Sequence, residues 1–125
     1  MNVISSEDAP KAIGPYSQAI SSGTHVFLSG QIPLNPKSGN IEGKTIEEQT
    51  EQVLNNLKAV LSAAGTDLSH VVRCTVFLAD LSEFGAFNKV YGTFFALNPP
   101  ARSTVQVAKL PRDAKIEIDA IAVKD

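Results

Sequence analysis

The sequence has only one cysteine and two histidines, and these scarcities exclude two kinds of structural cross-link. Cys74 has no second cysteine to pair with, so no disulfide can form within the chain, which favours a reducing compartment. A tetrahedral zinc site needs four ligands, and Cys74, His25 and His70 supply only three without help from a carboxylate. We therefore expect neither a disulfide nor a metal.

The chain also lacks an excess of positive charge and any long apolar run. Its 11 basic and 13 acidic residues give a net charge of -2, so no electropositive field attracts nucleic acid or an anionic membrane. No stretch approaches the roughly 18 apolar residues of a membrane span, and the first ten residues include Glu7 and Asp8 but no signal-peptide core. We expect a cytoplasmic protein that binds neither nucleic acid nor membrane.

Charged residues are scarce overall, at 19% against a typical share of about 25%. The 125 residues fit one domain, spanning residues 1–125, and the 43% hydrophobic content suits a folded globular chain. A surface with so few charges indicates that part of it is covered by another protein copy.

Local signals predict seven elements in the order β-β-α-β-α-β-β. The first helix has a capping box at Thr45 and Glu48 and a terminating glycine at Gly65, and the second is expected to start at a Ser82 cap. Alternation and turn residues predict the strands at residues 17–20, 25–28, 70–79, 102–110 and 114–123, with 70–79 as a central strand. The fold class is α+β, a mixed sheet with two helices on one face.

The last predicted strand indicates what covers the other face of the sheet. One side of it carries Ile116, Ile118, Ala120 and Ala122, while Ile121 and Val123 lie on the opposite side. Both faces are therefore expected to be partly buried. Because 125 residues cannot supply a second covering layer, we expect a neighbouring subunit to provide it.

Few residues suggest chemistry on their own. The chain has no phosphate-binding loop, paired metal-ligand histidines, nucleophile elbow or dinucleotide motif. His25 and His70 are best interpreted as structural histidines and Cys74 as a small buried hydrophobe. Arg102 is either a carboxylate-binding fork or a strand-end arginine facing water, and Glu117 is either a base of raised pKa or the partner of a cation.

Five segments together resemble the RidA family, also called YjgF/YER057c/UK114. They are Gly14-Pro15-Tyr16-Ser17-Gln18, Ser29-Gly30-Gln31-Ile32-Pro33, residues 88–91, Pro100-Ala101-Arg102-Ser103 and Ile116-Glu117-Ile118. The resemblance spans essentially the whole chain.

The resemblance implies a homotrimer of chorismate-mutase-like (YjgF-like) subunits with ligand clefts between them. It implies a cofactor-free 2-iminobutanoate/2-iminopropanoate deaminase. Such enzymes hydrolyse the enamines and imines released by pyridoxal-phosphate enzymes such as threonine dehydratase, giving 2-oxo acids and ammonia.

The resemblance also implies roles for individual residues. Arg102 would bind the substrate carboxylate, and Glu117 would hold or activate the attacking water. The cleft would be lined by Tyr16, Ser29, Gly30, Asn88 and Tyr91, although a helix-surface amide and a core aromatic are the alternatives for the last two. Thr104 would also contact the substrate, and it stands where many members have a cysteine, which argues against a thiol-dependent mechanism.

Two other functions remain as alternatives. A ribonuclease or translation inhibitor of the endoribonuclease L-PSP type is disfavoured, because two scattered histidines and a net charge of -2 offer little for RNA cleavage. A regulatory trimer that binds a small 2-oxo acid would use Arg102 equally well. Glu117 distinguishes the deaminase from the regulatory trimer, because a hydrolase also needs a group that holds or activates water.

Overall fold

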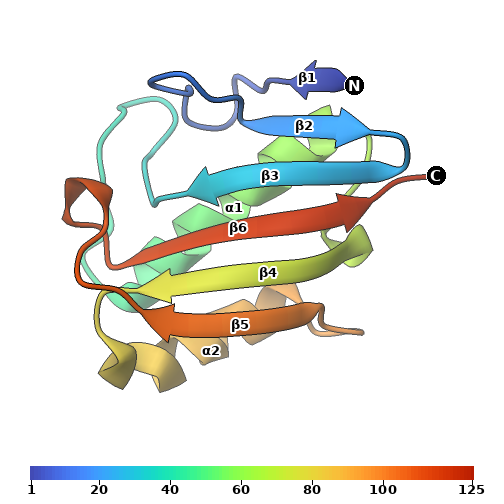
Figure 1. The fold of residues 1–125 in the computed structure, drawn as a ribbon. Helices are drawn as coiled ribbons and strands as arrows, with labels where there is room; N and C mark the ends of the chain where they lie inside the picture. Colours follow the sequence, from blue (N-terminus) through green and yellow to red (C-terminus); the bar gives the residue numbers. More distant parts are fainter.

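The computed structural model describes Met1–Asp125 as a six-stranded mixed sheet with two helices behind it (Figure 1). The strands are β1 (Asn2–Ile4), β2 (Ala19–Ser22), β3 (His25–Gln31), β4 (Val71–Leu78), β5 (Ala101–Gln106) and β6 (Ile116–Val123), and the helices are α1 (Ile46–Ala63) and α2 (Phe84–Phe94). The strand order is β1-β2-β3-β6-β4-β5, and only β4 and β5 run parallel. The α+β class, the mixed sheet and the interior position of β4 are as predicted.

The strands differ from the sequence prediction mainly at their ends. Strand β1 was not predicted, because three residues are too few to show the alternation of apolar and polar residues that marks a strand. The β2–β3 turn is reduced to Gly23, with φ 59°, and Thr24, so Ser21 and Ser22 belong to β2. Strand β5 stops at Gln106 because its only neighbour, β4, ends opposite it at Leu78.

Helix α1 begins and ends where local signals predicted. The Thr45 side chain accepts from the Glu48 backbone N–H, the Glu48 carboxylate accepts from the Thr45 N–H, and Gly65 follows the helix with φ 82°. The helix then buries an apolar face made of Val53, Leu54, Leu57, Val60 and Leu61 against the sheet.

The predicted Ser82 cap of α2 is wrong. Asp80 caps a short 3-10 turn, η2 (Leu81–Glu83), by accepting from the Ser82 backbone N–H at 2.9 Å and its hydroxyl at 2.7 Å. An ionised carboxylate is the stronger acceptor, so the cap forms two residues earlier and α2 begins only at Phe84.

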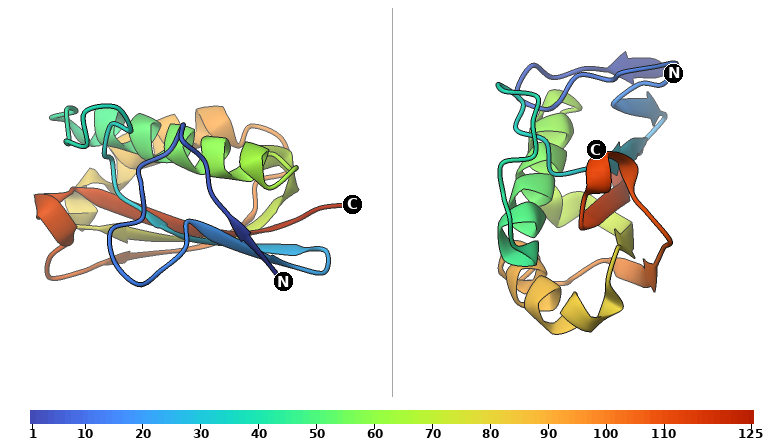
Figure 2. Two further views of the ribbon diagram at one scale, coloured as in Figure 1. Left: turned by 90° about the horizontal axis from the view of Figure 1, so that it is seen from above. Right: turned by 90° about the vertical axis from the view of Figure 1, so that its left-hand side faces the viewer.

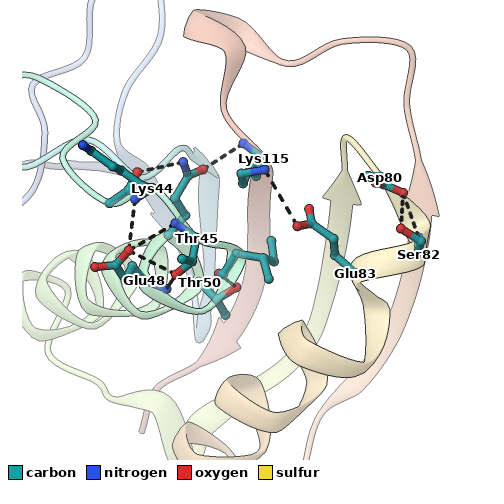
Figure 3. A network of polar contacts seen from close by, with 11 residues as sticks. Lys44, Thr45, Glu48, Thr50, Asp80, Ser82, Glu83 and Lys115 are labelled. Carbon is teal, nitrogen blue, oxygen red and sulfur yellow. Dashed lines mark hydrogen bonds and ion pairs between the residues drawn. The ribbon is translucent and has the colours of Figure 1, made fainter.

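A polar network ties the starts of both helices to the start of β6 (Figure 3). Gln49 donates from Nε2 to the Gly43 carbonyl at 3.0 Å and accepts from the Lys115 backbone N–H at 2.8 Å. The Lys115 ammonium lies 3.8 Å from the Glu83 carboxylate. These contacts fix the segment that leads into Glu117.

The two helices cover one face of the sheet and leave the other open (Figure 2). Along β6 the alternation is strict, with Ile116 and Ile118 buried on the helix side and Glu117 and Asp119 half-buried on the open side. The open face also carries a row of apolar cross-strand neighbours, Val3, Ile20, Phe27 and Ile121. Phe27 is 45% exposed, so this side is uncovered within one chain, as predicted.

Candidate functional site

Arg102 lies on the helix side of β5, packed against aromatic rings of α2. Its guanidinium carbon lies 4.7 Å from the ring centroid of Tyr91, 5.2 Å from that of Phe87 and 5.5 Å from that of Phe84. Such cation–π contacts contribute about 0.5–2 kcal/mol each to orienting the cation, depending on its exposure. The interpretation of Arg102 as a strand-end arginine facing water is therefore wrong.

No ion pair of the chain includes the Arg102 guanidinium, so its positive charge has no carboxylate partner. It lines a hollow of about 430 Å³ together with Asn88, Tyr91 and Pro100. The structure thus brings three of the predicted site residues together. An arginine fixed on rings and without a carboxylate partner of its own is suited to bind a planar carboxylate through two parallel hydrogen bonds.

Two hydroxyls and one thiol, those of Tyr91, Thr104 and Cys74, are buried on the helix side of the sheet near Arg102, and of these three residues only Tyr91 lines the hollow. The Tyr91 and Thr104 hydroxyl oxygens are buried without a hydrogen-bond partner. Burial, followed by the neighbouring Cys74, raises the pKa of the Tyr91 hydroxyl, so Tyr91 stays protonated at neutral pH. Cys74 is buried, as predicted, and burial raises the pKa of its thiol, which disfavours the nucleophilic thiolate.

The histidines lie outside this hollow. His25 is exposed and stacks on Phe27 at a centroid distance of 6.1 Å. His70 ends the short η1 turn (Leu68–His70), where its Nδ1 lies 2.9 Å from the Asp67 carboxylate. Neither lines the hollow of Arg102, so neither is placed to act on a ligand there.

Ser29, Gly30 and Glu117 form a second half of the site on β3 and β6. The Glu117 carboxylate lies directly against the Cα of Gly30, so that a methyl group placed there would be only 2.9 Å from Glu117 Cδ. This close approach requires glycine. The Ser29 hydroxyl donates to the Ser17 carbonyl at 2.6 Å and so holds the preceding loop.

Tyr16 borders the same region from the N-terminal loop. Its side chain is 51% exposed, and its hydroxyl accepts from the Ile13 backbone N–H at 3.4 Å. Tyr16 and Gly30 both line a second cavity, of about 360 Å³. Tyr16, Ser29, Gly30 and Glu117 therefore gather at one end of β3.

Glu117 has no cationic partner within the chain. Burial raises the pKa of its carboxyl group above the ordinary glutamate value, and the negative charge of Asp119 raises it further. Of the two interpretations of Glu117, the structure favours the base of raised pKa over the partner of a cation.

The two halves do not meet within one chain. Cys74 pairs with Arg102 on one side and with Ala120 on the other, which places Arg102 on the helix side of the sheet. Glu117 alternates with the buried Ile118 and so faces the open side. Strand β4 also lies between β5 and β6. Side-chain alternation therefore contradicts any single-chain site that contains both Arg102 and Glu117.

The aromatic support of Arg102 was missed as a functional feature. The helical spacing of Phe84, Phe87 and Tyr91 predicted a helix packed on a sheet, which is correct. Nothing in that spacing indicates that Arg102, eleven residues beyond Tyr91, lies on the same rings. Only the parallel pairing of β5 with β4 places it there.

Nowhere do three His, Cys, Asp or Glu side chains gather closely enough to hold a metal ion. Neither helix combines the length and the apolar character needed to cross a membrane.

Comparison with known proteins identifies the family. A family model described as endoribonuclease L-PSP matches residues 6–124. Protein DfrA of Myxococcus xanthus is 58% identical over 122 residues, which cover 96% of this chain and 93% of that protein. The 2-iminobutanoate/2-iminopropanoate deaminase of Mus musculus is 48% identical over 122 residues, covering 98% and 90% of the two chains.

Solved structures of related proteins have the same fold as this chain. The crystal structure of E. coli TdcF with bound serine superimposes with a TM-score of 0.96 at 44% identity and full coverage of both chains. The chain therefore belongs to the RidA (YjgF/YER057c/UK114) family, as its motifs indicated.

Proposed function

We propose that this protein is an imine deaminase that hydrolyses 2-iminobutanoate and 2-iminopropanoate to 2-oxo acids and ammonia. The observation that carries the proposal is the Arg102 guanidinium, held on three aromatic rings with no carboxylate of the chain paired to it. The mouse relative bears the name of this activity and is 48% identical, which supports the same chemistry here.

The proposed reaction needs one anion-binding group and one group that manages water. Arg102 binds the substrate carboxylate and thereby fixes the position of the C=N carbon. On the protonated imine, Glu117 takes a proton from a bound water as the water oxygen bonds to that carbon, which gives a neutral carbinolamine. Glu117 then gives this proton to the nitrogen, the C–N bond breaks with its electron pair leaving as ammonia, and Glu117 takes the hydroxyl proton as the C=O bond forms.

The site becomes complete only when two chains meet. Because Arg102 and Glu117 lie on opposite faces of one sheet, we propose that Glu117 of one subunit faces Arg102 of its neighbour in a homotrimer. The apolar row of Val3, Ile20, Phe27 and Ile121 on the open face supports burial between subunits.

A coupled assay tests the proposal. Threonine dehydratase generates 2-iminobutanoate, and the 2-oxo acid is followed with and without the protein, while light scattering gives the mass in solution. We expect acceleration by a trimer. An intact trimer that accelerates nothing but binds 2-oxobutanoate would instead identify a binding module, and a monomer would contradict the shared site.

Gly30→Ala tests the Glu117 half of the site without touching a polar group. The new methyl group would displace the Glu117 carboxylate, since it would lie 2.9 Å from Cδ and 3.1 Å from Cγ. We expect kcat to fall by about tenfold or more, because general-base catalysis depends on placement and is worth about 10²–10⁴-fold.

Gly85→Ala is the matched control, because a methyl group there meets no atom within 4 Å. It should leave kcat close to that of the unmodified protein and should not lower the melting temperature, because alanine favours a helix more than glycine does. A Gly30→Ala variant with full activity would show that the position of the Glu117 carboxylate does not matter.

A further inference from the structure

The cavity of about 360 Å³ lies at the end of the sheet where β3 ends and β6 begins. Three segments distant in sequence meet there: the N-terminal loop, the chain that follows β3, and the 3-10 turn η3 (Pro111–Asp113), all at the same end of the sheet in Figure 1. Its volume lies within the usual range of small-molecule sites, roughly 300–1,000 Å³.

Gln31 provides the first indication of a ligand. The residue is only 6% exposed and lines the cavity, yet its side-chain amide forms no hydrogen bond within the chain. The other buried glutamines are fully engaged: Gln18 bonds to Ser6 and Pro10, and Gln49 bonds to Gly43 and Lys115. Of the fully buried side-chain polar atoms only the Tyr91 and Thr104 hydroxyls lack a partner, so the Gln31 amide is open to the cavity and can donate to a group bound there.

Two cations supply the second indication. Lys11 and Arg112 line the same cavity, and neither forms an ion pair with a carboxylate of the chain. Arg112 has a left-handed backbone, with φ 60°, and its guanidinium reaches only neutral oxygens of Gly39 and Asn40 at 3.4 and 3.5 Å. The charge of this rim is therefore available to an anion.

Ile13, Ile32, Leu34 and Pro111 add an apolar part to the cavity wall. A ligand that suits them carries a short hydrocarbon segment ending in an acid group. Phosphate or sulfate alone would leave these walls uncovered.

The cavity is continuous with the proposed reaction site, because Tyr16 and Gly30 line it and Glu117 lies against Gly30. We infer that the cavity binds the substrate's side chain and favours 2-imino and 2-oxo acids whose side chain ends in a second carboxylate. Gln31 would donate to that carboxylate, and Lys11 and Arg112 would provide the charge. This inference rests on the proposed function, which supplies the other end of the substrate.

The test compares two 2-oxo acids as ligands of the assembled protein by calorimetry. The probes are 2-oxobutanoate, with an apolar side chain, and 2-oxoglutarate, with a second carboxylate. We expect 2-oxoglutarate to bind about tenfold more tightly, as one additional charge-assisted hydrogen bond allows. The preference should shrink as salt is added, since the rim residues are exposed.

Lys11→Gln combined with Arg112→Gln should bring the ratio of the two affinities to about one. Both residues are exposed, so the substitutions leave the core intact. Gln31→Met keeps the bulk of the side chain but removes its amide, and should lower the same ratio. Lys109→Gln is the control, because this lysine pairs with Asp113 at 3.3 Å and does not line the cavity.

The outcomes separate this inference from the proposed function. If 2-oxobutanoate binds and its imine is hydrolysed, but 2-oxoglutarate shows no preference or one that survives the substitutions, only the side-chain assignment is overturned. If neither acid binds and no imine is hydrolysed, the proposed function fails and the inference fails with it. A tenfold preference that the cavity variants alone abolish supports both.

Discussion

Arg102→Lys is expected to lower kcat/KM for 2-iminobutanoate by about 10²-fold. Lysine keeps the positive charge but presents no planar fork, so the two parallel hydrogen bonds to the substrate carboxylate are lost. Each charge-assisted hydrogen bond is worth about 1.5–3 kcal/mol, and losing the net worth of one to two gives this factor. An ammonium also stacks less well on the rings of Phe84, Phe87 and Tyr91, which now orient the guanidinium.

The measurement is kcat and KM separately, in the coupled assay, for Arg102→Lys and Arg102→Ala. Arg73→Lys is a matched control, because Arg73 lies on the adjacent strand β4 and bonds to the Ser103 hydroxyl at 2.8 Å, away from the aromatic rings. We expect Arg73→Lys to retain its activity and its mass in solution. Full activity of Arg102→Lys would remove Arg102 from its role as carboxylate clamp.

Glu117→Gln is expected to lower kcat by about 10²–10⁴-fold, because glutamine cannot accept a proton from water. The pH profile carries a signature of the carboxylate itself. Activity of the unmodified protein should fall as the pH drops through the Glu117 pKa, which burial and Asp119 raise above the ordinary glutamate value. This acidic inflection should be missing from the residual rate of Glu117→Gln.

The same substitution should change stability in the opposite direction to activity. A carboxyl group whose pKa is raised by folding destabilises the folded state when it is ionised, that is, above its folded pKa. A single subunit of Glu117→Gln should therefore melt at a higher temperature than an unmodified subunit at neutral pH, whereas in the proposed trimer the facing Arg102 of the neighbour would offset this gain. The difference should vanish as the pH falls below the unfolded value, where the carboxyl group is protonated in both states.

Asp119→Asn provides the control for Glu117. Asp119 lies two residues along β6 on the same face, and it accepts from the Thr75 backbone N–H at 3.3 Å. Removing its negative charge should lower the pKa of Glu117 and shift the acid inflection to lower pH, with kcat at neutral pH largely retained. An inflection that does not move would show that Glu117 is not the titrating group.

The sequence by itself determined the features that depend on neighbouring residues. Helix α1 follows from contacts within four residues of each end, at Thr45, Glu48 and Gly65, and its inward face follows from the 3.6-residue period. The open face followed from the alternation along β6. Even at this local level Asp80 displaced Ser82 as the cap, because two acceptors two residues apart competed for the same turn.

Tertiary structure decided which distant residues meet. Strand β6 is last in the chain but lies between β3 and β4, which places Glu117 against Gly30, and β5 pairs with β4 so that Arg102 rests on α2. These pairings depend on contacts between residues tens of positions apart, which no local period encodes. For the same reason only the structure shows that Arg102 and Glu117 lie on opposite faces of the sheet, because the face of each side chain depends on strand register.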